Sequence, residues 1–243
     1  MQKEIRDWYT SWFNTPYYHL LYKDRGTNEA VQFMDNLMSF LKLKKGSSVL
    51  DLACGKGRHA KHLHSLGYDV TGVDLSPKSI EAAKEYEQPG LQFDVHDMCL
   101  PYPKKFDAVV NLFTSFGYFE NDEDNLRTIK AIKAELKPSG YGVIDFLNAN
   151  YVIENLVSDE QKKVGDVTFF IERYVEDGYI FKNIRFQDKG QNYFFTERVQ
   201  AITLDHFKAY FKESGIEVRA VFGDYQLNSY HKETSERLIL IFN

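Results

Sequence analysis

Between residues 28 and 150, short apolar runs alternate with stretches whose apolar positions recur every three or four residues. The runs are typical of buried strands, and the stretches are typical of amphipathic helices. We expect strands at residues 49–53, 69–75, 91–95, 106–112 and 141–147. Helices are expected at residues 28–41, 58–66, 76–87 and 121–137. This alternation predicts a parallel sheet with helices on both faces.

The pattern changes over residues 164–203, where residues that favour strands replace the helical spacing. Three strands are expected there, at residues 167–175, 179–186 and 192–202. The segments between them end in Asp177-Gly178 and Lys189-Gly190, which are hairpin signals. An antiparallel β insert is therefore predicted after the fifth strand.

A last helix at residues 204–214 and strands at residues 216–221 and 237–242 bring the predicted core sheet to seven strands. The predicted fold class is α/β, with a doubly wound, mostly parallel seven-stranded sheet and a small antiparallel β insert. Four parts are expected along the chain: an N-terminal aromatic lid segment (1–27), an α/β core (28–150), the β insert (151–203), and a C-terminal helix with two core strands (204–243).

Composition narrows the choice of partners. The chain has 243 residues, a formal net charge of −5 and a pI of about 5.8, which argues against a nucleic-acid partner. Its two cysteines, Cys54 and Cys99, lack paired spacing, which fits a reducing compartment. The charged N-terminus lacks the apolar core of a signal peptide, and no run is apolar enough to span a membrane. We therefore expect a cytoplasmic protein without membrane association.

The first predicted strand leads into Gly55 and Gly57, spaced Gly-x-Gly, and then into a helix. Glycine permits positive φ and lets a ligand approach the backbone, so this arrangement is typical of a nucleotide cradle. A carboxylate at Asp51, just before the turn, would repel a pyrophosphate and attract a cation. It favours S-adenosylmethionine, which carries an ammonium and a sulfonium, over NAD. The alternative is that Asp51 caps a turn or pairs with Lys56 or Arg58.

Polar side chains follow the next strands as well. Asp74 ends the second strand, about twenty residues past the glycines, where a carboxylate can accept both ribose hydroxyls of either cofactor. After the third strand, Asp97 could accept the adenine amino group, with Met98 packed on the ring. Asn111 ends the fourth strand. Because ligands of open parallel sheets bind outside the carboxyl ends of the strands, we expect these side chains to share one site.

These segments resemble the class I S-adenosylmethionine-dependent methyltransferases over roughly residues 28–150. The resemblance rests on V-L-D-L-A-C-G-K-G at 49–57, G-V-D-L-S at 72–76, H-D-M at 96–98, F-D-A-V-V-N at 106–111 and L-K-P-S-G at 136–140. It implies a Rossmann-like, cofactor-binding core, S-adenosyl-L-methionine as cofactor and S-adenosyl-L-homocysteine as product. The implied activity is methyl transfer to a small-molecule acceptor, which these motifs do not identify.

The aromatic N-terminal segment resembles the tyrosine-bearing lid of small-molecule methyltransferases. That likeness implies that Tyr18 or Tyr22 contacts the cofactor carboxylate and that Arg25 pairs with it; the alternative is an aromatic helix packed on the sheet. An aromatic loop after Asn111, including Phe113, would wall the pocket and stabilise the sulfonium, or would only pack between strand and helix. The expected cofactor-binding residues are Tyr18, Tyr22, Arg25, Asp51, Ala53, Gly55, Gly57, Arg58, Asp74, Leu75, Asp97, Met98, Asn111 and Phe113.

Catalysis of methyl transfer requires mainly alignment and exclusion of water, because the cofactor supplies the driving force. A His, Tyr or carboxylate is needed only where the acceptor loses a proton. The candidate catalytic residues are His19, Tyr118 and His231; His59, near the glycine turn, is more often a helix-surface residue. No cluster has metal-ligand spacing, so no metal is expected. Neither Asn-Pro-Pro-Tyr nor Pro-Cys follows the fourth strand, so nucleobase methylation is not expected either.

Two other functions stay open. One is an NAD-dependent oxidoreductase, although Asp51, Asp97 and the lack of a second substrate domain count against it. The other is a non-catalytic S-adenosylmethionine-binding subunit that activates a partner. We also expect the β insert to roof the pocket or to bury against a second subunit in a homodimer, because its strands would otherwise leave exposed edges. Nitrogen, oxygen and carbon acceptors are all compatible with the sequence.

Overall fold

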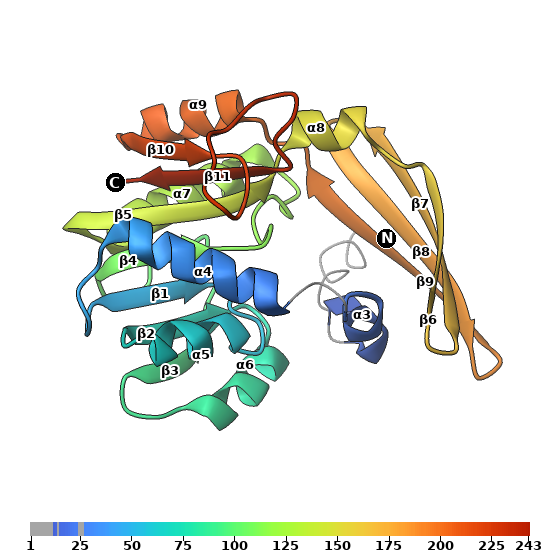
Figure 1. Cartoon of the computed structure of the whole chain (residues 1–243), viewed down its shortest axis with the longest axis horizontal. Coiled ribbons are helices and arrows are strands. Elements are labelled where there is room, and N and C mark those ends of the chain that lie inside the picture. The colour runs from blue at the N-terminus through green and yellow to red at the C-terminus, as the bar shows by residue number, and fades with distance from the viewer. Residues whose placement is uncertain (1–11, 14, 24–26) are drawn as a thin grey trace.

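The molecule contains a helix-covered sheet, sheet A, and a second sheet, sheet B, with the short helix α3 (Pro16–Leu21) between them (Figure 1). The computed structural model describes residues 12–13, 15–23 and 27–243. Sheet A has seven strands in the order β10-β11-β5-β4-β1-β2-β3. Its strands are β1 (Ser48–Leu52), β2 (Asp69–Asp74), β3 (Leu91–Val95), β4 (Phe106–Asn111), β5 (Leu136–Leu147), β10 (Val218–Phe222) and β11 (Arg237–Phe242). Sheet B contains β6 (Asp159–Val164), β7 (Val167–Glu176), β8 (Tyr179–Asp188) and β9 (Gln191–Gln200).

Helices cover both faces of sheet A. The described helices are α3 (Pro16–Leu21), α4 (Thr27–Leu41), α5 (Arg58–Ser65), α6 (Pro77–Ala83), the 3₁₀ turn η1 (Lys84–Tyr86), α7 (Asp122–Glu135), α8 (Ala149–Glu154) and α9 (Leu204–Ser214). Helices α4, α5 and α6 pack on one face, and α7 and α9 pack on the other. The central strands are apolar on both faces because each face is buried under helices.

Pairing directions in sheet A confirm the predicted fold class. Strands β3, β2, β1, β4 and β5 run parallel, whereas β11 pairs antiparallel with β5 and with β10. The carboxyl ends of the parallel strands therefore meet at one edge of sheet A, and Figure 1 shows that this edge faces α3 and sheet B. The division of the chain into four parts stays a proposal.

Sheet B is an antiparallel meander whose inner face packs against the N-terminal segment. Trp12 and Leu21 join Phe169, Ile184 and Phe186 in one buried cluster. Pro16 occupies the first turn of α3, where its missing N–H costs nothing. The N-terminal segment and sheet B are therefore packed together as one body beside the core.

Several local details differ from the sequence prediction, among them the following. Strand β6 was not predicted because it has the polar sequence Asp-Glu-Gln-Lys-Lys-Val, which is typical of a charged edge strand. The predicted helix 76–87 divides into α6 and η1. The third insert strand ends at Gln200 rather than at residue 202. At its end, the Gln200 N–H donates to the Gly117 carbonyl beside sheet A.

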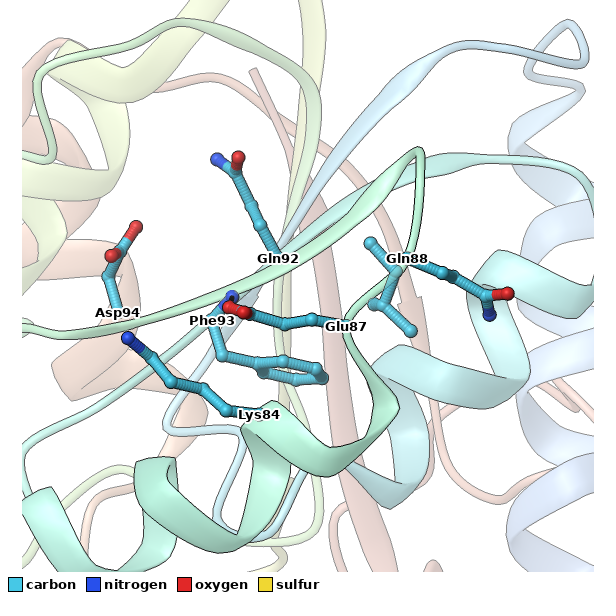
Figure 2. A pocket seen from close by; sticks show the side chains of 7 residues that line it. Lys84, Glu87, Gln88, Gln92, Phe93 and Asp94 are labelled. Atoms are coloured by element: carbon cyan, nitrogen blue, oxygen red, sulfur yellow. Dashed lines mark hydrogen bonds between the residues drawn. The ribbon is translucent and has the colours of Figure 1, made fainter.

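A shallow depression of about 480 Å³ lies along the outer edge of β3 (Figure 2). Lys84, Glu87, Gln92 and Asp94 surround it, and a Glu87 carboxylate oxygen accepts the Phe93 N–H at 3.0 Å. Glu87 thus accepts a hydrogen bond from a backbone N–H of β3, the edge strand of sheet A. Without this bond, that N–H could pair with a strand of another chain. The depression lies at the side of the sheet rather than at the strand ends.

Candidate active site

The glycine turn after β1 has a left-handed backbone. Ala53, Gly55 and Gly57 have φ values of 66°, 56° and 78°, which bring the chain back sharply into α5. A Cβ added at Gly57 would lie 2.7 Å from the Phe93 ring, so only glycine fits there. The turn therefore leaves the backbone open at the carboxyl end of β1, as expected for a cofactor cradle.

Asp51 is a buried carboxylate at the end of β1. Asp51 is only 2% exposed, and its Oδ2 has no hydrogen-bond partner among the described residues. Burial, and next the neighbouring charge of Asp74, raise the pKa of Asp51 to about 7, while the Ala60 N–H lowers it. A buried carboxylate with a free oxygen beside a second carboxylate is costly in an empty protein.

Asp74, at the end of β2, is held by the glycine turn. Its Oδ2 accepts the Gly55 N–H at 2.9 Å, and its Oδ1 accepts the Ser76 N–H at 2.8 Å. Burial raises the pKa of Asp74, and these two hydrogen bonds oppose the increase. Each oxygen keeps further acceptor capacity, so both could receive ribose hydroxyls. The next residue, Leu75, is 48% exposed and offers an apolar surface at the same edge.

Asn111, at the end of β4, is fully buried. Its Nδ2 donates to the Leu52 carbonyl at 2.9 Å and lies 4.0 Å from the Met98 sulfur. Its Oδ1 has no partner among the residues that the structure describes. Half-buried Asp97 precedes Met98 and accepts the Cys99 N–H. The structure thus gathers Asp51, Asp74, Met98 and Asn111 around the ends of three adjacent strands.

The chemistry of this set favours a ligand that is positive or rich in donors. Asp51 and Asp74 raise the electrostatic cost of each other's charge, and no described cation pairs with Asp51. An ammonium, a sulfonium and a ribose diol would supply the missing charge and hydrogen bonds, whereas a pyrophosphate would increase the repulsion. The residues therefore fit S-adenosylmethionine better than NAD.

The loop after β4 packs against the start of α5. Phe113 and Thr114 both have left-handed backbones, with φ of 59° and 61°. The Phe113 ring lies 4.4 Å from the His59 ring, and exposed Arg58 contacts His59 at 3.0 Å. Burial, and then Arg58, lower the pKa of His59 to about 3, so it is neutral at pH 7 and a weak base. Its position agrees with a packing role.

The N-terminal tyrosines have partners in sheet B. Tyr22 donates to Glu197 Oε1 at 2.6 Å and accepts from Lys182 at 2.5 Å, and Trp12 Nε1 also donates to Glu197. Tyr18 packs edge-on against Tyr22 at 4.8 Å. Tyr22 is therefore directed at the insert rather than at the glycine turn, and Arg25 lies outside the described residues.

The three candidate catalytic residues lie on different elements. His19 Nε2 is 2.9 Å from Lys56 Nζ, which links α3 to the glycine turn; burial, and then Lys56, lower the pKa of His19. The Tyr118 ring lies 5.9 Å from Phe13, beneath the N-terminal segment. His231 is exposed on the connection between β10 and β11. The structure thus places His19 on the N-terminal segment, Tyr118 against that segment, and His231 on a separate exposed turn.

Sequence reasoning missed a buried ion pair next to this edge. Asp145 on β5 is fully buried, and its Oδ1 accepts from Arg237 Nη2 at 2.7 Å and from Arg237 Nε at 2.9 Å. Its signal was an acidic residue inside the apolar run of the fifth strand, residues 143–147. A charge at such a position requires a buried partner.

Known proteins match this chain in sequence and fold. Residues 49–140 match the model of a family described as "Methyltransferase domain". An N,N-dimethyltransferase of dTDP-3-amino-3,4,6-trideoxy-α-D-glucopyranose from Streptomyces venezuelae is 27% identical over 218 residues, or 85% of this chain and 91% of the relative. A glycine/sarcosine N-methyltransferase from Aphanothece halophytica is 26% identical over 79% of this chain and 74% of its own.

Solved structures share the fold. An S-adenosylmethionine-dependent methyltransferase from Clostridium acetobutylicum superposes with a TM-score of 0.78 at 22% identity, covering 93% of this chain and 95% of that one. An amino pentose methyltransferase from Micromonospora echinaspora, solved with S-adenosylmethionine bound, gives 0.73 at 18% identity, covering 94% and 96%. At these identities the likeness shows the fold alone.

Fold, motifs and sequence relatives together define the class of protein. The chain carries a methyltransferase domain at residues 49–140 and resembles the class I S-adenosylmethionine-dependent methyltransferases in motifs and fold; its cofactor is S-adenosyl-L-methionine. Within the described ranges, no three His, Cys, Asp or Glu side chains are grouped so that they could hold a metal ion. A search of the same ranges finds no helix with the length and apolarity needed to cross a membrane.

Proposed function

We propose that this protein transfers a methyl group from S-adenosylmethionine to an amine of a small molecule, at the carboxyl edge of sheet A. The observation that carries the proposal is the unpartnered Oδ2 of Asp51, buried beside the carboxylate of Asp74. Such a site is stabilised when a cation with hydrogen-bond donors enters it.

Each strand end has a proposed role in holding the cofactor. Asp51 accepts the ammonium, Asp74 accepts the ribose hydroxyls, and Asp97 with Met98 receives the adenine. Phe113 borders the sulfonium end beside Asn111. When bound, the cofactor supplies an activated methyl group and a neutral leaving thioether. The remaining expected residues, Tyr18, Tyr22, Arg25, Ala53, Gly55, Gly57, Arg58 and Leu75, stay proposals, and for Tyr22 the bond to Glu197 favours a role in fixing the lid.

The protein's share of catalysis is alignment and exclusion of water. Helix α3 and sheet B face the strand ends, so an acceptor between them would be shielded from solvent (Figure 1). Holding donor and acceptor in line can lower the barrier by roughly 7–11 kcal/mol. No strong base is needed for a neutral amine, because its nitrogen lone pair attacks directly and the proton leaves afterwards.

An amine acceptor is favoured by the relatives. Two of them, which match most of this chain, are named for methylation of an amino sugar and of glycine or sarcosine. Both acceptors are small and carry a nitrogen nucleophile. Tyr118 and His19 remain the better-placed candidates for receiving the proton, since His231 is exposed on a turn outside the N-terminal segment.

We also propose that the outer face of sheet B contacts a second copy of the chain. Phe170 and Phe194 are 54% and 56% exposed on this face. Arg185 and Glu172 lie 3.8 Å apart there, so a two-fold rotation can place each against its opposite in the partner. Light scattering should report a dimer, and Phe194→Asp should give a monomer. A monomeric wild-type chain would refute this contact.

A cytoplasmic location without a nucleic-acid partner stays a prediction.

The acceptor can be tested with small amines. Native mass spectrometry of the purified protein should first show whether a ligand is retained. Transfer of radiolabelled methyl from S-adenosylmethionine should then be measured with glycine, sarcosine and dTDP-3-amino-3,4,6-trideoxy-α-D-glucopyranose as probes, with ethanolamine as a simple amine control. Methyl transfer to an amine supports the proposal. S-adenosylmethionine binding without transfer to any amine or retained ligand would favour a non-catalytic partner subunit.

A further inference from the structure

Two consecutive strained residues follow β4. Phe113 and Thr114 both adopt left-handed φ, although neither is glycine. Such conformations persist only where the surroundings over-determine them, and they gather at functional sites. Here they turn the chain immediately after Asn111, whose Oδ1 lacks a partner among the described residues, and place Phe113 against His59. The backbone is therefore fixed at the point where the candidate cofactor site begins.

Asp145 holds this turn through two separate groups. Its side-chain Oδ2 accepts the Phe113 N–H at 2.8 Å, and its backbone carbonyl accepts the Thr114 N–H at 3.0 Å. Tyr225 approaches the same Oδ2 at 3.4 Å and packs its ring 5.7 Å from Phe113. One residue of β5 thus fixes both strained amides.

Arg237 completes the arrangement from β11. Its Nη2 donates to Asp145 Oδ1 at 2.7 Å and to Thr114 Oγ1 at 2.9 Å. Burial would lower the pKa of Arg237, but Asp145 and then Tyr225, whose ring lies 5.4 Å from the guanidinium, raise it. Arg237 therefore contacts the loop directly at Thr114. A planar guanidinium can make these bonds simultaneously, whereas an ammonium cannot match the same fork.

We propose that Asp145 and Arg237 are a positioning pair, which holds the loop from Phe113 to Tyr118 against the methyl end of the cofactor. The proposal rests on the proposed function, because it needs the cofactor at the ends of β1 and β4. The pair acts on the ligand through the loop and does not bind it. Disturbing the pair should therefore weaken recognition of the methylsulfonium more than recognition of the rest of the cofactor.

The two forms of the cofactor separate these effects, since S-adenosylhomocysteine lacks the methyl group and the positive sulfur. Calorimetry should compare both ligands on wild type, Arg237→Lys, Arg237→Met, Thr114→Val and Thr114→Ser. Lys137→Met is the control, because Lys137 pairs with Asp107 at 2.7 Å at the opposite end of β4. Amide hydrogen exchange over residues 112–118 should report whether the loop loosens.

For Arg237→Lys and Thr114→Val we expect affinity for S-adenosylmethionine to fall by about tenfold, the size of one cation–π contact. Affinity for S-adenosylhomocysteine should fall by less than about threefold, which is below 1 kcal/mol. Exchange over residues 112–118 should accelerate. Thr114→Ser, which keeps the hydroxyl, and Lys137→Met should preserve the wild-type ratio of the two affinities.

An unchanged ratio of the two affinities in Arg237→Lys and Thr114→Val would overturn the positioning role. This holds whether both affinities stay at their wild-type values or both fall equally with the melting temperature, as for a purely structural ion pair. If Arg237→Met proves unstable, the affinities of Arg237→Lys and Thr114→Val decide whether the pair has a positioning role. Failure of the proposed cofactor site would look different, since wild type would then bind neither ligand, and failure of the proposed methyl transfer would leave both affinities measurable.

Discussion

The polar side chains at the two ends of strands β1 and β4 differ in their hydrogen-bond partners. At the amino ends, Asp107 Oδ2 accepts from Ser48 N and Oγ, both at 2.8 Å, and from Lys137 at 2.7 Å. Although partial burial alone would raise it, the bonds from Lys137 and Ser48 hold the pKa of Asp107 below its usual value. One oxygen of this carboxylate thus joins β1, β4 and the start of β5.

The carboxyl ends of the same strands are unsatisfied. Asp51 Oδ2 and Asn111 Oδ1 are buried without partners among the described residues, and the pKa of Asp51 is raised to about 7. The polar side chains at the amino ends of these strands thus stabilise the fold, whereas those at the carboxyl ends keep acceptor oxygens that a ligand can use. Variants at the carboxyl ends should therefore mainly change ligand affinity, whereas variants at the amino ends should mainly change stability.

The largest expected effect comes from Asp74. Asp74→Ala should weaken S-adenosylhomocysteine binding by about 30- to 1000-fold, or roughly 2–4 kcal/mol, because charge-assisted bonds to the ribose are lost. Asp74 also accepts the Gly55 and Ser76 N–H groups, so the empty variant should lose stability as well. Asp74→Asn, which keeps one of the two acceptor oxygens, should show a smaller loss of both affinity and stability than Asp74→Ala.

Calorimetry and thermal melting with and without S-adenosylhomocysteine measure both quantities. In wild type, added ligand should raise the melting temperature, because it binds only the folded state. Equal ligand-induced shifts in wild type and Asp74→Ala would show that Asp74 does not hold the ribose. The contrast between the two edges of the sheet would then lose its main support.

The next effect is a pH dependence set by Asp51. The pKa of Asp51 is about 7, so below pH 7 most chains carry a protonated Asp51. That carboxyl must lose its proton before it can pair with the ammonium of the ligand. Affinity for S-adenosylhomocysteine should therefore rise by about tenfold between pH 5.5 and pH 7. In the empty protein the sign is opposite: a raised carboxyl pKa means that stability falls as pH rises from about 4 to 7.

Asp51→Asn is the control for this pH dependence. The variant should bind more weakly at pH 7, and its affinity should change little over the same range. A wild-type affinity that is flat between pH 5.5 and pH 7, measured by calorimetry in matched buffers, would contradict an unpaired Asp51 in the empty site.

The smallest effect concerns the amino edge. Asp107→Asn should lower stability by about 1–2 kcal/mol, or roughly 2–6 °C in melting temperature, because a charged acceptor of three hydrogen bonds becomes neutral. The stability that Asp107 provides should be present above about pH 4 and lost in acid, since its pKa is lowered on folding. Affinity for S-adenosylhomocysteine should stay within about twofold of wild type. A large loss of affinity would mean that the two edges are coupled.

The core of sheet A could be predicted from the sequence because its strands are continuous apolar runs between helical patterns. The gathering of Asp51, Asp74 and Asn111 could also be predicted, since parallel strands end at one edge. Strand β6 could not, because its charged sequence carries no apolar alternation and is defined only by pairing with β7.

Side-chain partners far apart in sequence were beyond such reasoning. Glu197 lies 175 residues from Tyr22, and only the folded insert brings their oxygens within 2.6 Å. Arg237 meets Asp145 because β11 pairs antiparallel with β5, with Ile239 opposite Asp145 and Arg237 two residues away on the same face. That register is set by the whole sheet rather than by either strand.

The central claim is that the carboxyl edge of sheet A binds a positive cofactor without phosphate. The most direct test is calorimetry of the wild-type protein at pH 7 with S-adenosylhomocysteine and with NAD. We predict saturable binding of S-adenosylhomocysteine with one site per chain and no measurable heat with NAD. Saturable binding of NAD, with no response to S-adenosylhomocysteine, would contradict the assignment of Asp51 and Asp74.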